Sequence, residues 1–381
     1  MKNVLLIVPR LWQGGHEAVC VATARLLKDK ANVSLLIFDD YQIHYDTSGL
    51  ELINIDLGAR PGRLAKVLNI MRRVRKVRQI KKERHIDVTY SFGESASIIN
   101  CLTGVGDRIV SGIHGGIILD NQRTMKLFCK RSDALISVSK AMTERIRSDY
   151  HSDKAVTVYN PVDIEDISKR SMEPVTDHPF EDREHVIVTV GREDDQKGYW
   201  HLIKAFSLLE DKSYKLMIIG SGDFAAYEKL SLELGLEDRV VFTGLKKNPF
   251  AYERGCALYV LSSNHEGFPG AMLEAMALGI PVVAADCETG PREILIPDGD
   301  AASRIGEPVH GMGGILIPDM DHEADMDPCH ITDDDRMLCK AMTEMLSDPV
   351  KRDRAAVSGR ERVRAFSAES YIRDISTVLR I

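Results

Sequence analysis

The sequence predicts an α/β protein of two consecutive domains, and this prediction depends on chain length and on the hydrophobic pattern. A chain of 381 residues is long for one domain and suits two domains of ordinary size. Apolar runs of strand length alternate with helix-periodic segments in residues 2–158, and the alternation begins again at residue 185. Such alternation is typical of parallel βαβ units, so we expect two sheets and a ligand-binding cleft between the domains.

The first domain is predicted for residues 1–163 and the second for residues 185–366. First-domain strands are expected at residues 2–9, 33–38, 52–55, 87–91, 109–114, 134–138 and 156–158, with helices at 18–27 and 62–84. Residues 164–184 are polar, contain Pro174 and Pro179 and have no clear period, so they are expected to form a linker.

The second domain should repeat the pattern. Its strands are expected at residues 185–190, 215–219, 240–243, 257–261, 281–285 and 315–317, and its helices at 200–209, 225–234, after Gly270, 336–346 and 350–365. Residues 319–335 are expected to be an exposed acidic loop. A last helix within residues 367–381 carries Tyr371, Ile375, Val378 and Leu379 on one side.

The composition is that of a soluble globular protein. Hydrophobic residues make up 44% and charged residues 28% of the chain. The seven cysteines include no CxxC pair, no signal peptide precedes the first strand, and no apolar run is long enough to span a membrane. We therefore expect a reduced, cytoplasmic protein.

The net charge of −7 is unevenly distributed. Residues 60–84 hold eleven Lys or Arg and one Glu, whereas residues 319–335 hold eight acidic residues and no Lys or Arg. An acidic protein with one dense basic element points to a local anionic partner, and not to general affinity for nucleic acid.

The most informative stretch contains two glutamates, Glu266 in a strand-to-helix loop and Glu274 in the helix that follows. Gly267 and Gly270 allow a ligand to approach the backbone, with Pro269 suited to the first helical position. The helix N-terminus favours an anion, and carboxylates accept hydrogen bonds from hydroxyls. A nucleotide-sugar combines both features. The alternative is an ordinary loop with two solvated glutamates.

Three further loops fit a phosphate-bearing ligand. Gly14 and Gly15 follow the first strand, with Glu17 completing Gly-Gly-x-Glu, and Gly220 and Gly222 follow a second-domain strand. Arg192 after Gly191 and Lys197 before Gly198 supply two cations that can clamp a diphosphate. The alternatives are plain turns and solvated cations, or a local salt bridge with the acids at 193–195.

These motifs, in this order, resemble the retaining GT-B glycosyltransferases of the GT4 type (glycosyl transferases group 1). Glu-Gly-Phe-Pro-Gly-x-x-x-Leu-Glu-Ala, which starts at Glu266, is similar to the signature of that family. The resemblance covers most of the chain but not residues 298–313 or 319–335. It implies a GT-B fold of two Rossmann-like domains that face a cleft, with the terminal helix crossing back onto the first domain.

The resemblance also implies roles for the site residues. Arg192 and Lys197 would stabilise the departing diphosphate in place of a metal, Glu274 would hold the ribose hydroxyls, and Glu266 and His114 would lie at the donor sugar. The alternative for His114 is a surface residue at a strand end. Donor contacts are expected at Gly14, Gly15, Gly191, Gly220, Gly222, Gly267, Phe268, Pro269 and Gly270.

The expected function is transfer of a hexose or N-acetylhexosamine, with retention, from a nucleotide-sugar, expected to be a UDP-sugar, to a membrane-lipid-linked sugar acceptor. No cofactor and no metal are expected, because the sequence shows no strand-end Asp-x-Asp of the kind that GT-A enzymes use to hold a divalent cation, and the acidic run that ends in Asp333-Asp334-Asp335 is expected to be solvated. Two alternatives stay open: a GT-B nucleotide-sugar epimerase, which needs no acceptor, and a non-catalytic protein that binds sugar nucleotides or acts as a membrane scaffold.

The basic segment 60–84 predicts where the acceptor lies. Its helix is expected to pack an apolar stripe on the first sheet while its cations face water. The stripe consists of Leu64, Val67, Leu68, Met71, Val74 and Val77. We expect the cations Arg72, Arg73, Arg75 and Lys76 to hold the protein peripherally at the anionic inner face of a membrane. A similar helix occurs in GT4 enzymes with lipid-carried acceptors, so a polyprenyl-diphosphate acceptor is expected. A nucleic-acid groove is disfavoured, because no aromatic residues interleave the cations.

Overall fold

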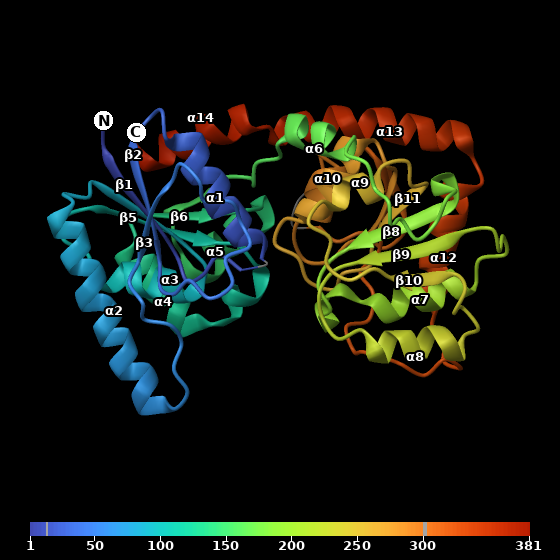
Figure 1. Cartoon of the computed structure of the whole chain (residues 1–381), viewed down its shortest axis with the longest axis horizontal. Helices are drawn as coiled ribbons and strands as arrows, with labels where there is room; N and C mark the ends of the chain where they lie inside the picture. Colours follow the sequence, from blue (N-terminus) through green and yellow to red (C-terminus); the bar gives the residue numbers. More distant parts are fainter. Residues whose placement is uncertain (13, 300–302) are drawn as a thin grey trace. The chain divides into compact units, whose positions relative to one another are not determined.

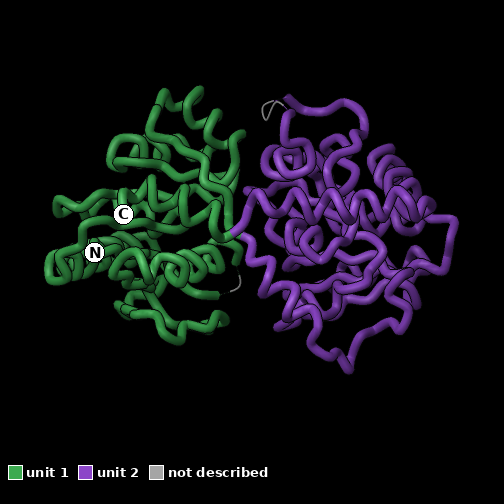
Figure 2. The backbone as a smooth tube through the Cα atoms, turned by 90° about the horizontal axis from the view of Figure 1, so that it is seen from above, with its two compact units in different colours: residues 1–161, 368–381 green, residues 162–367 purple. Residues whose placement is uncertain are grey.

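The computed structural model describes residues 1–12, 14–299 and 303–381, and it divides into two compact units (Figure 2). Unit 1 is Met1–Pro161 with Ala368–Ile381, and unit 2 is Val162–Ser367. Each unit has its own sheet with helices on both faces (Figure 1). The two expected α/β sheets are therefore confirmed.

Unit 1 has a parallel sheet in the order β3-β2-β1-β4-β5-β6-β7. The strands are β1 Asn3–Val8, β2 Asn32–Ile37, β3 Glu51–Asn54, β4 Val88–Phe92, β5 Arg108–Ile113, β6 Ala134–Ser137 and β7 Ala155–Thr157. The helices are α1 Gly15–Leu27, α2 Arg63–Glu83, α3 Glu94–Leu102, α4 Gln122–Arg131, α5 Lys140–Tyr150 and α14 Ala368–Leu379. The central strands are mostly apolar and buried because helices cover both faces of a parallel sheet.

The terminal helix α14 belongs to unit 1, as expected. Tyr371, Ile375 and Leu379 are buried in the same hydrophobic cluster as α1 and β1. The Tyr371 hydroxyl lies 2.5 Å from Thr23 Oγ1, and the Arg108 guanidinium donates to the Val378 carbonyl. The chain therefore returns to the first sheet after completing the second.

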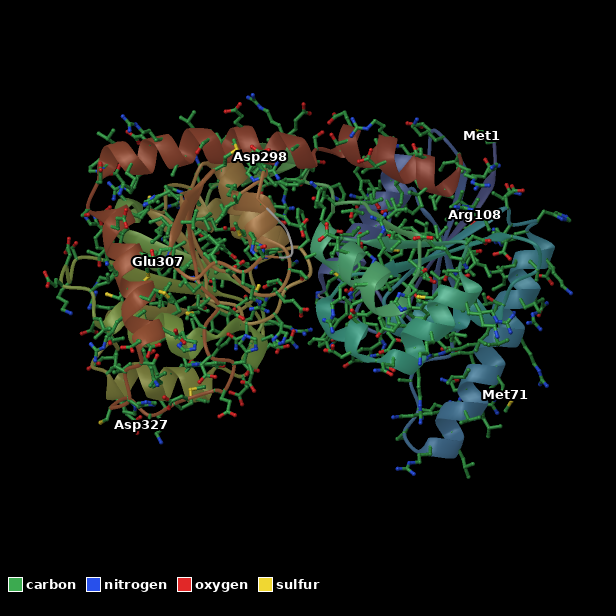
Figure 3. The ribbon with its side chains drawn as sticks, turned by 180° about the vertical axis from the view of Figure 1, so that it is seen from behind. Met1, Met71, Arg108, Asp298, Glu307 and Asp327 are labelled. Carbon is green, nitrogen blue, oxygen red and sulfur yellow. The ribbon has the colours of Figure 1, made fainter. Side chains whose placement is uncertain are left out.

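Helix α2 packs on the opposite face, but only with its C-terminal half. Val77 and Ile80 are buried against β1 and β2, and Lys81 is fully buried with Nζ 2.8 Å from Asp107 Oδ2. The expectation that the whole apolar stripe packs on the sheet is wrong. The N-terminal half extends past the sheet (Figures 1 and 3), so it has no sheet to cover. Its apolar residues Leu64, Val67, Leu68 and Met71 are exposed, Leu64 to 83%.

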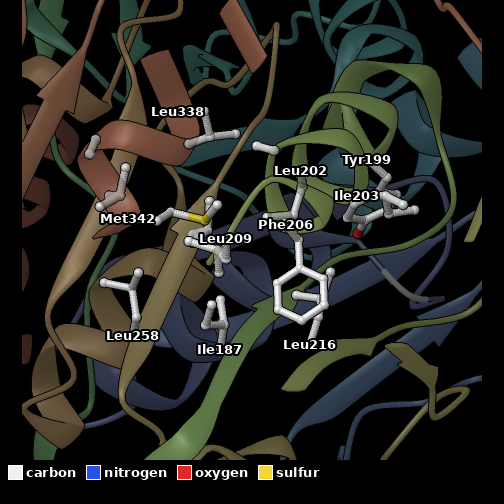
Figure 4. Close-up of a cluster of buried hydrophobic side chains, with 14 of the residues drawn as sticks. Ile187, Tyr199, Leu202, Ile203, Phe206, Leu209, Leu216, Leu258, Leu338 and Met342 are labelled. Carbon is white, nitrogen blue, oxygen red and sulfur yellow. The ribbon is translucent and has the colours of Figure 1, made fainter. Parts of the chain in front are cut away.

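Unit 2 has a sheet in the order β10-β9-β8-β11-β12-β14-β13, parallel except for β13 against β14. The strands are β8 Val186–Val190, β9 Lys215–Ile219, β10 Val240–Phe242, β11 Leu258–Leu261, β12 Val282–Ala285, β13 Val309–Gly311 and β14 Gly314–Ile317. The helices are α6 Ile164–Ser171, α7 Tyr199–Ser207, α8 Ala225–Glu233, α9 Pro249–Glu253, α10 Gly270–Leu278, α11 Pro291–Leu295, α12 Asp333–Leu346 and α13 Pro349–Val363. Figure 4 shows the buried cluster in which α7 and α12 cover this sheet, including Phe206, Leu258 and Met342.

The segment expected to be an irregular linker, 164–184, begins with helix α6. Asp163 caps this helix by accepting a hydrogen bond from the Asp166 amide at 2.9 Å, and Ile167 is buried. Helix α6 packs against α9 and α10. These contacts bury one side of a helix that is too short to show a clear hydrophobic period in the sequence. The two prolines fall after its end, so only the later part is irregular.

The acidic stretch 319–335 is attached to α7 by two buried side chains, and its last residues begin α12. Lys204 donates to Asp325 at 2.7 Å. His201 places Nδ1 2.6 Å from Asp335 Oδ1 and Nε2 3.0 Å from the Asp321 carbonyl. Asp335 is fully buried, so the expectation of an entirely exposed loop is wrong at its C-terminal end.

The environment of His201 predicts a pH-dependent stability. Burial lowers its pKa, but the hydrogen bonds to Asp335 and Asp321 raise it more, so the pKa lies above its ordinary value of ~6.5. A raised folded pKa stabilises the fold fully below ~6.5, and this contribution is lost as the pH rises through the folded value. We expect the melting temperature of the wild type to fall over this window. His201→Gln should lack this part of the slope, and parallel curves for the two proteins would contradict the assignment.

Candidate functional site

The candidate site of unit 2 lies at the carboxyl ends of three neighbouring parallel strands. The order β9-β8-β11 brings the loops that follow these strands to one edge of the sheet. They are the loops at 191–198, 220–222 and 262–269, and they contain most of the residues singled out in the sequence. This edge is where open α/β sheets bind ligands.

The glycines in these loops allow backbone segments to touch. A Cβ on Gly220 would lie 1.8 Å from the Gly191 carbonyl oxygen, and one on Gly198, which has φ +57°, would lie 2.2 Å from the Ser262 carbonyl oxygen. Gly222 has φ +139° and equally leaves no room for a side chain. The first role of these glycines is therefore to interlock the three loops.

Lys197 and Glu266 form the central contact of the site. Lys197 Nζ donates to Glu266 Oε1 at 2.7 Å, and both side chains are largely shielded from solvent. The Thr289 hydroxyl donates to the Glu266 carbonyl. The two residues are far apart in sequence. The structure therefore brings together a side chain expected to bind phosphate, Lys197, and one expected to bind the sugar, Glu266.

Arg192 is paired within its own loop. Its Nη2 and Nε lie 2.8 and 3.1 Å from Asp194 Oδ2, while the side chain is 56% exposed. This is the local salt bridge that was one alternative to a phosphate clamp. The same Asp194 accepts a hydrogen bond from the Gln196 amide and so begins the 3-10 helix Asp195–Lys197.

The loop before α10 is held by packing. Pro269 is the N-cap and not the first helical residue as expected, and the helix begins at Gly270. The Phe268 ring is buried against Phe366 with ring centroids 5.1 Å apart, and Gly267 is also buried. The Phe268 side chain therefore supports the loop, and a ligand would meet its backbone.

Glu274 is partly buried and lies between Leu273 and Ala275, which are fully buried. Burial raises its pKa to about 7, and the charge of Arg170 partly offsets this. Arg170 comes from α6, where its guanidinium also donates to the Lys247 carbonyl at 2.8 Å. Arg170 was not predicted as a site residue, because residues 164–184 were expected to form a linker.

Glu253 was also missed. It ends helix α9, is fully buried, and neither carboxylate oxygen has a hydrogen-bond partner in the described part of the chain. Burial and the charge of Glu274 raise its pKa well above the ordinary range. Burial and the charge of Glu274 therefore both favour the neutral form of Glu253. An acidic residue at the end of the short segment Pro249–Glu253, whose other residues are all apolar or aromatic, was the signal available in the sequence.

Unit 1 has its own candidate site at the carboxyl edge of its sheet. His114 follows β5 and stacks on Phe92 at 5.3 Å between ring centroids. Burial and the nearby His16 lower the pKa of His114 to about 3, so its ring is neutral near pH 7. Neither ring nitrogen of His114 has a hydrogen-bond partner among the described residues, which leaves both for a ligand.

The glycine loop of unit 1 lies at the start of α1. Gly14 is the N-cap, and a Cβ there would lie 2.0 Å from Glu17 Oε2, whereas Gly15 faces open space. Glu17 Oε2 is 3.2 Å from His16 Nδ1, and the His16 ring lies 6.2 Å from that of His114. Gln13, which precedes this motif, is outside the described residues. His16 had no expected role, although its place inside Gly-Gly-x-Glu was a signal.

The described ranges contain neither a cluster of metal-ligating side chains nor a membrane-spanning helix. No group of three or more His, Cys, Asp or Glu side chains there is arranged to hold a metal ion. No helix in the same ranges is long and apolar enough to cross a bilayer.

Comparison with known families identifies the class. Residues 13–166 match the model of Glycosyltransferase Family 4, and residues 174–304 match that of Glycosyl transferases group 1. Both domains are therefore accounted for by one class, the GT-B glycosyltransferases. The chain belongs to the family-4, or group 1, glycosyltransferases, as the sequence motifs indicated.

Individual relatives agree with this assignment. An uncharacterized glycosyltransferase of Methanocaldococcus jannaschii is 32% identical over 69% of this chain and 66% of its own length, just under two thirds. The N-acetylgalactosamine-N,N'-diacetylbacillosaminyl-diphospho-undecaprenol 4-alpha-N-acetylgalactosaminyltransferase of Campylobacter jejuni is 24% identical over 78% of this chain and 84% of its own. Anabaena HepE in complex with UDP-glucose has a TM-score of 0.78 at 20% identity, with both chains covered completely.

The raised pKa of Glu274 generates a prediction about ligand affinity. If its carboxylate accepts the ribose hydroxyls, UDP should bind more tightly as the pH rises from about 6 to about 8, because the charged form is the better acceptor. UDP titrates in part of this range, with a phosphate pKa of ~6. The readout is therefore the difference between wild type and Glu274→Gln in calorimetric titrations. Identical profiles would contradict the role, and Glu228→Gln, on the exposed part of α8, is the control.

Proposed function

We propose that this glycosyltransferase transfers a hexose or N-acetylhexosamine from a UDP-sugar, with retention, to a sugar acceptor carried on a membrane lipid. The observation that carries the proposal is the Lys197–Glu266 ion pair beside Arg192 at the edge of the unit 2 sheet. UDP-glucose is the ligand named for HepE, and the name of the C. jejuni relative describes a diphospho-undecaprenol acceptor. Both support the choice of substrates.

The cations of this site would act on the diphosphate. A bound diphosphate carries two negative charges and several acceptor oxygens, so it would compete for Arg192 and Lys197 with the two carboxylates that hold them in the free protein. As the sugar leaves, charge grows on the diphosphate and the fixed cations stabilise it. This role is the one a metal fills in other transferases, so we propose that no metal and no cofactor are needed.

The carboxylates would hold hydroxyl groups. Glu266, released from Lys197 by the diphosphate, would accept hydrogen bonds from the transferred sugar, and Glu274 from the ribose. The neutral His114 suits a sugar hydroxyl as well. With no side chain proposed as a covalent nucleophile, we favour attack on the same face of the sugar, with the departing phosphate accepting the acceptor proton.

The experiment that tests this function is a screen of nucleotide-sugars with the purified protein, a lipid-linked acceptor and excess EDTA. We expect transfer from a UDP-sugar in the presence of EDTA, and an α-linked product from an α-donor by NMR. Loss of transfer that Mg²⁺ or Mn²⁺ restores would contradict the metal-free mechanism. A β-linked product would contradict retention, and acceptor-free isomerisation of the nucleotide-sugar would point to an epimerase.

The same assay tests the clamp. Arg192→Ala and Lys197→Ala should each lower kcat by roughly ten- to a thousandfold, the range for removing one contact to transition-state charge. Lys229→Ala removes a 74% exposed cation of unit 2 and should leave kcat unchanged. Turnover near the wild-type value in both clamp variants would rule out the assignment.

The exposed half of α2 supports peripheral binding to an anionic membrane. Leu64, Val67, Leu68 and Met71 are exposed there together with Arg63, Lys66, Arg72, Arg75 and Lys76. Arg73 departs from the expected membrane set, because its Nε donates to the Leu57 carbonyl at 2.7 Å and its guanidinium covers the Phe38 ring. A helix with exposed apolar and cationic side chains suits the interface of a bilayer. We propose that it holds the enzyme at the inner face, near a polyprenyl-linked acceptor.

Sedimentation with liposomes that contain anionic lipid tests this proposal. Each cation contributes about 1 kcal/mol at such a surface, so combined Arg72→Glu, Arg75→Glu and Lys76→Glu should lower binding at least about a hundredfold at low salt. Leu64→Ser with Leu68→Ser should also weaken it. Arg73→Gln is the matched control, expected to lower the melting temperature but not the binding. A wild type that fails to sediment at low salt would contradict the membrane role.

A further inference from the structure

The carboxylate of Asp194 contacts both parts of the loop that carries Arg192 and Lys197. Its Oδ1 accepts a hydrogen bond from the Gln196 amide at 3.1 Å, which begins the 3-10 helix Asp195–Lys197. Its Oδ2 accepts from Arg192 Nη2 and Nε at 2.8 and 3.1 Å. One side chain therefore connects the two cations of the clamp.

The contact with Asp194 orients the guanidinium of Arg192 but leaves some of its N–H groups available for a ligand. Arg192 offers five N–H groups in a rigid, planar fork, and the Nε–Nη2 edge is the part bound to Asp194. Nη1 has no hydrogen-bond partner among the described residues, and the side chain is 56% exposed. A long side chain that is already held in place loses less conformational freedom when a ligand binds.

Lys197 is oriented through the backbone of the same turn. Its amide donates to the Asp194 carbonyl at 2.9 Å, and the Gly198 amide donates to the Asp195 carbonyl at 3.1 Å. The turn ends at Gly198, whose contact with Ser262 leaves no room for a Cβ. Loss of the cap would therefore release the N-terminal side of the turn while its C-terminal side stays fixed.

We propose that Asp194 is a positioning residue for the diphosphate of the nucleotide-sugar, setting the Arg192 guanidinium by ion pairing and Lys197 by capping. The proposal rests on the function proposed above. It predicts the direction of the change in affinity. A carboxylate near a phosphate site is repulsive in itself, yet removing Asp194 should weaken diphosphate binding. If Asp194 were only a competitor for Arg192, its removal would strengthen binding.

Unit 2 contains a matched control for this arrangement. Asp182 caps the 3-10 helix Arg183–His185, with Oδ1 accepting from the Glu184 amide at 3.0 Å and Oδ2 2.7 Å from His185 Nδ1. It therefore makes the same two kinds of contact. It lies before β8, at the amino end of this strand, whereas Asp194 follows the carboxyl end.

The test is calorimetric titration of the whole protein with UDP and, as a base-independent probe, with inorganic pyrophosphate. Asp194→Ser keeps a capping oxygen but removes the ion pair, and it should raise the Kd for both ligands about fivefold or more, as for coupled residues in one charged network. Asp194→Asn has a single side-chain oxygen, which can accept from the Gln196 amide or from Arg192 but not from both, so it should also raise the Kd for both ligands. Asp182→Ser should leave both Kd values unchanged.

A double-mutant cycle separates positioning from general stability. In an Arg192→Ala background, Asp194→Ser should change the UDP Kd by less than about twofold, because the group that it orients is gone. An unchanged or lower Kd for Asp194→Ser in the wild-type background overturns the proposal and leaves the function standing. A wild type that binds neither UDP nor pyrophosphate overturns the proposed function as well.

Discussion

The pairing of β8 with β11 is the constraint on which the unit 2 site depends. These strands are distant in the chain, yet they are neighbours in the sheet, with Ile187 opposite Leu258 and Val188 opposite Tyr259. Parallel pairing aligns their carboxyl ends, so the loop that carries Lys197 meets the loop that carries Glu266. With β9 on the other side of β8, Gly220 fits against Gly191, and three loops become one surface.

Charges at this surface come in opposite pairs. Arg192 is held by Asp194, Lys197 by Glu266, and Glu274 lies in the field of Arg170. A charged side chain that is partly removed from water needs such a partner, and the partner also fixes its direction. The cations are therefore oriented before any ligand arrives, which is the condition for electrostatic stabilisation at low reorganisation cost.

Helix α2 shows how one sequence pattern can serve two surroundings. Its C-terminal half lies over the sheet. Even Lys81 is buried there, because Asp107 and Asn100 accept hydrogen bonds from its ammonium group. Its N-terminal half has the same apolar spacing but no sheet beneath it, and Leu64, Val67, Leu68 and Met71 remain exposed. Exposed apolar patches of this kind commonly mark a surface that meets another partner.

The two α/β domains and the loops of the site could be predicted from the sequence alone, because strand alternation and glycine turns are local signals. The return of α14 to the first domain was expected only from the resemblance to GT-B glycosyltransferases. The sequence also singled out Glu266, Glu274, Arg192 and Lys197. The pairing of these residues, the part of α2 that is covered and the helical state of α6 became evident only in the folded structure. Those outcomes depend on contacts with partners distant in the chain, such as α9 and α10 for α6, Arg170 for Glu274 and the end of the sheet for α2. Local spacing carries no information about them.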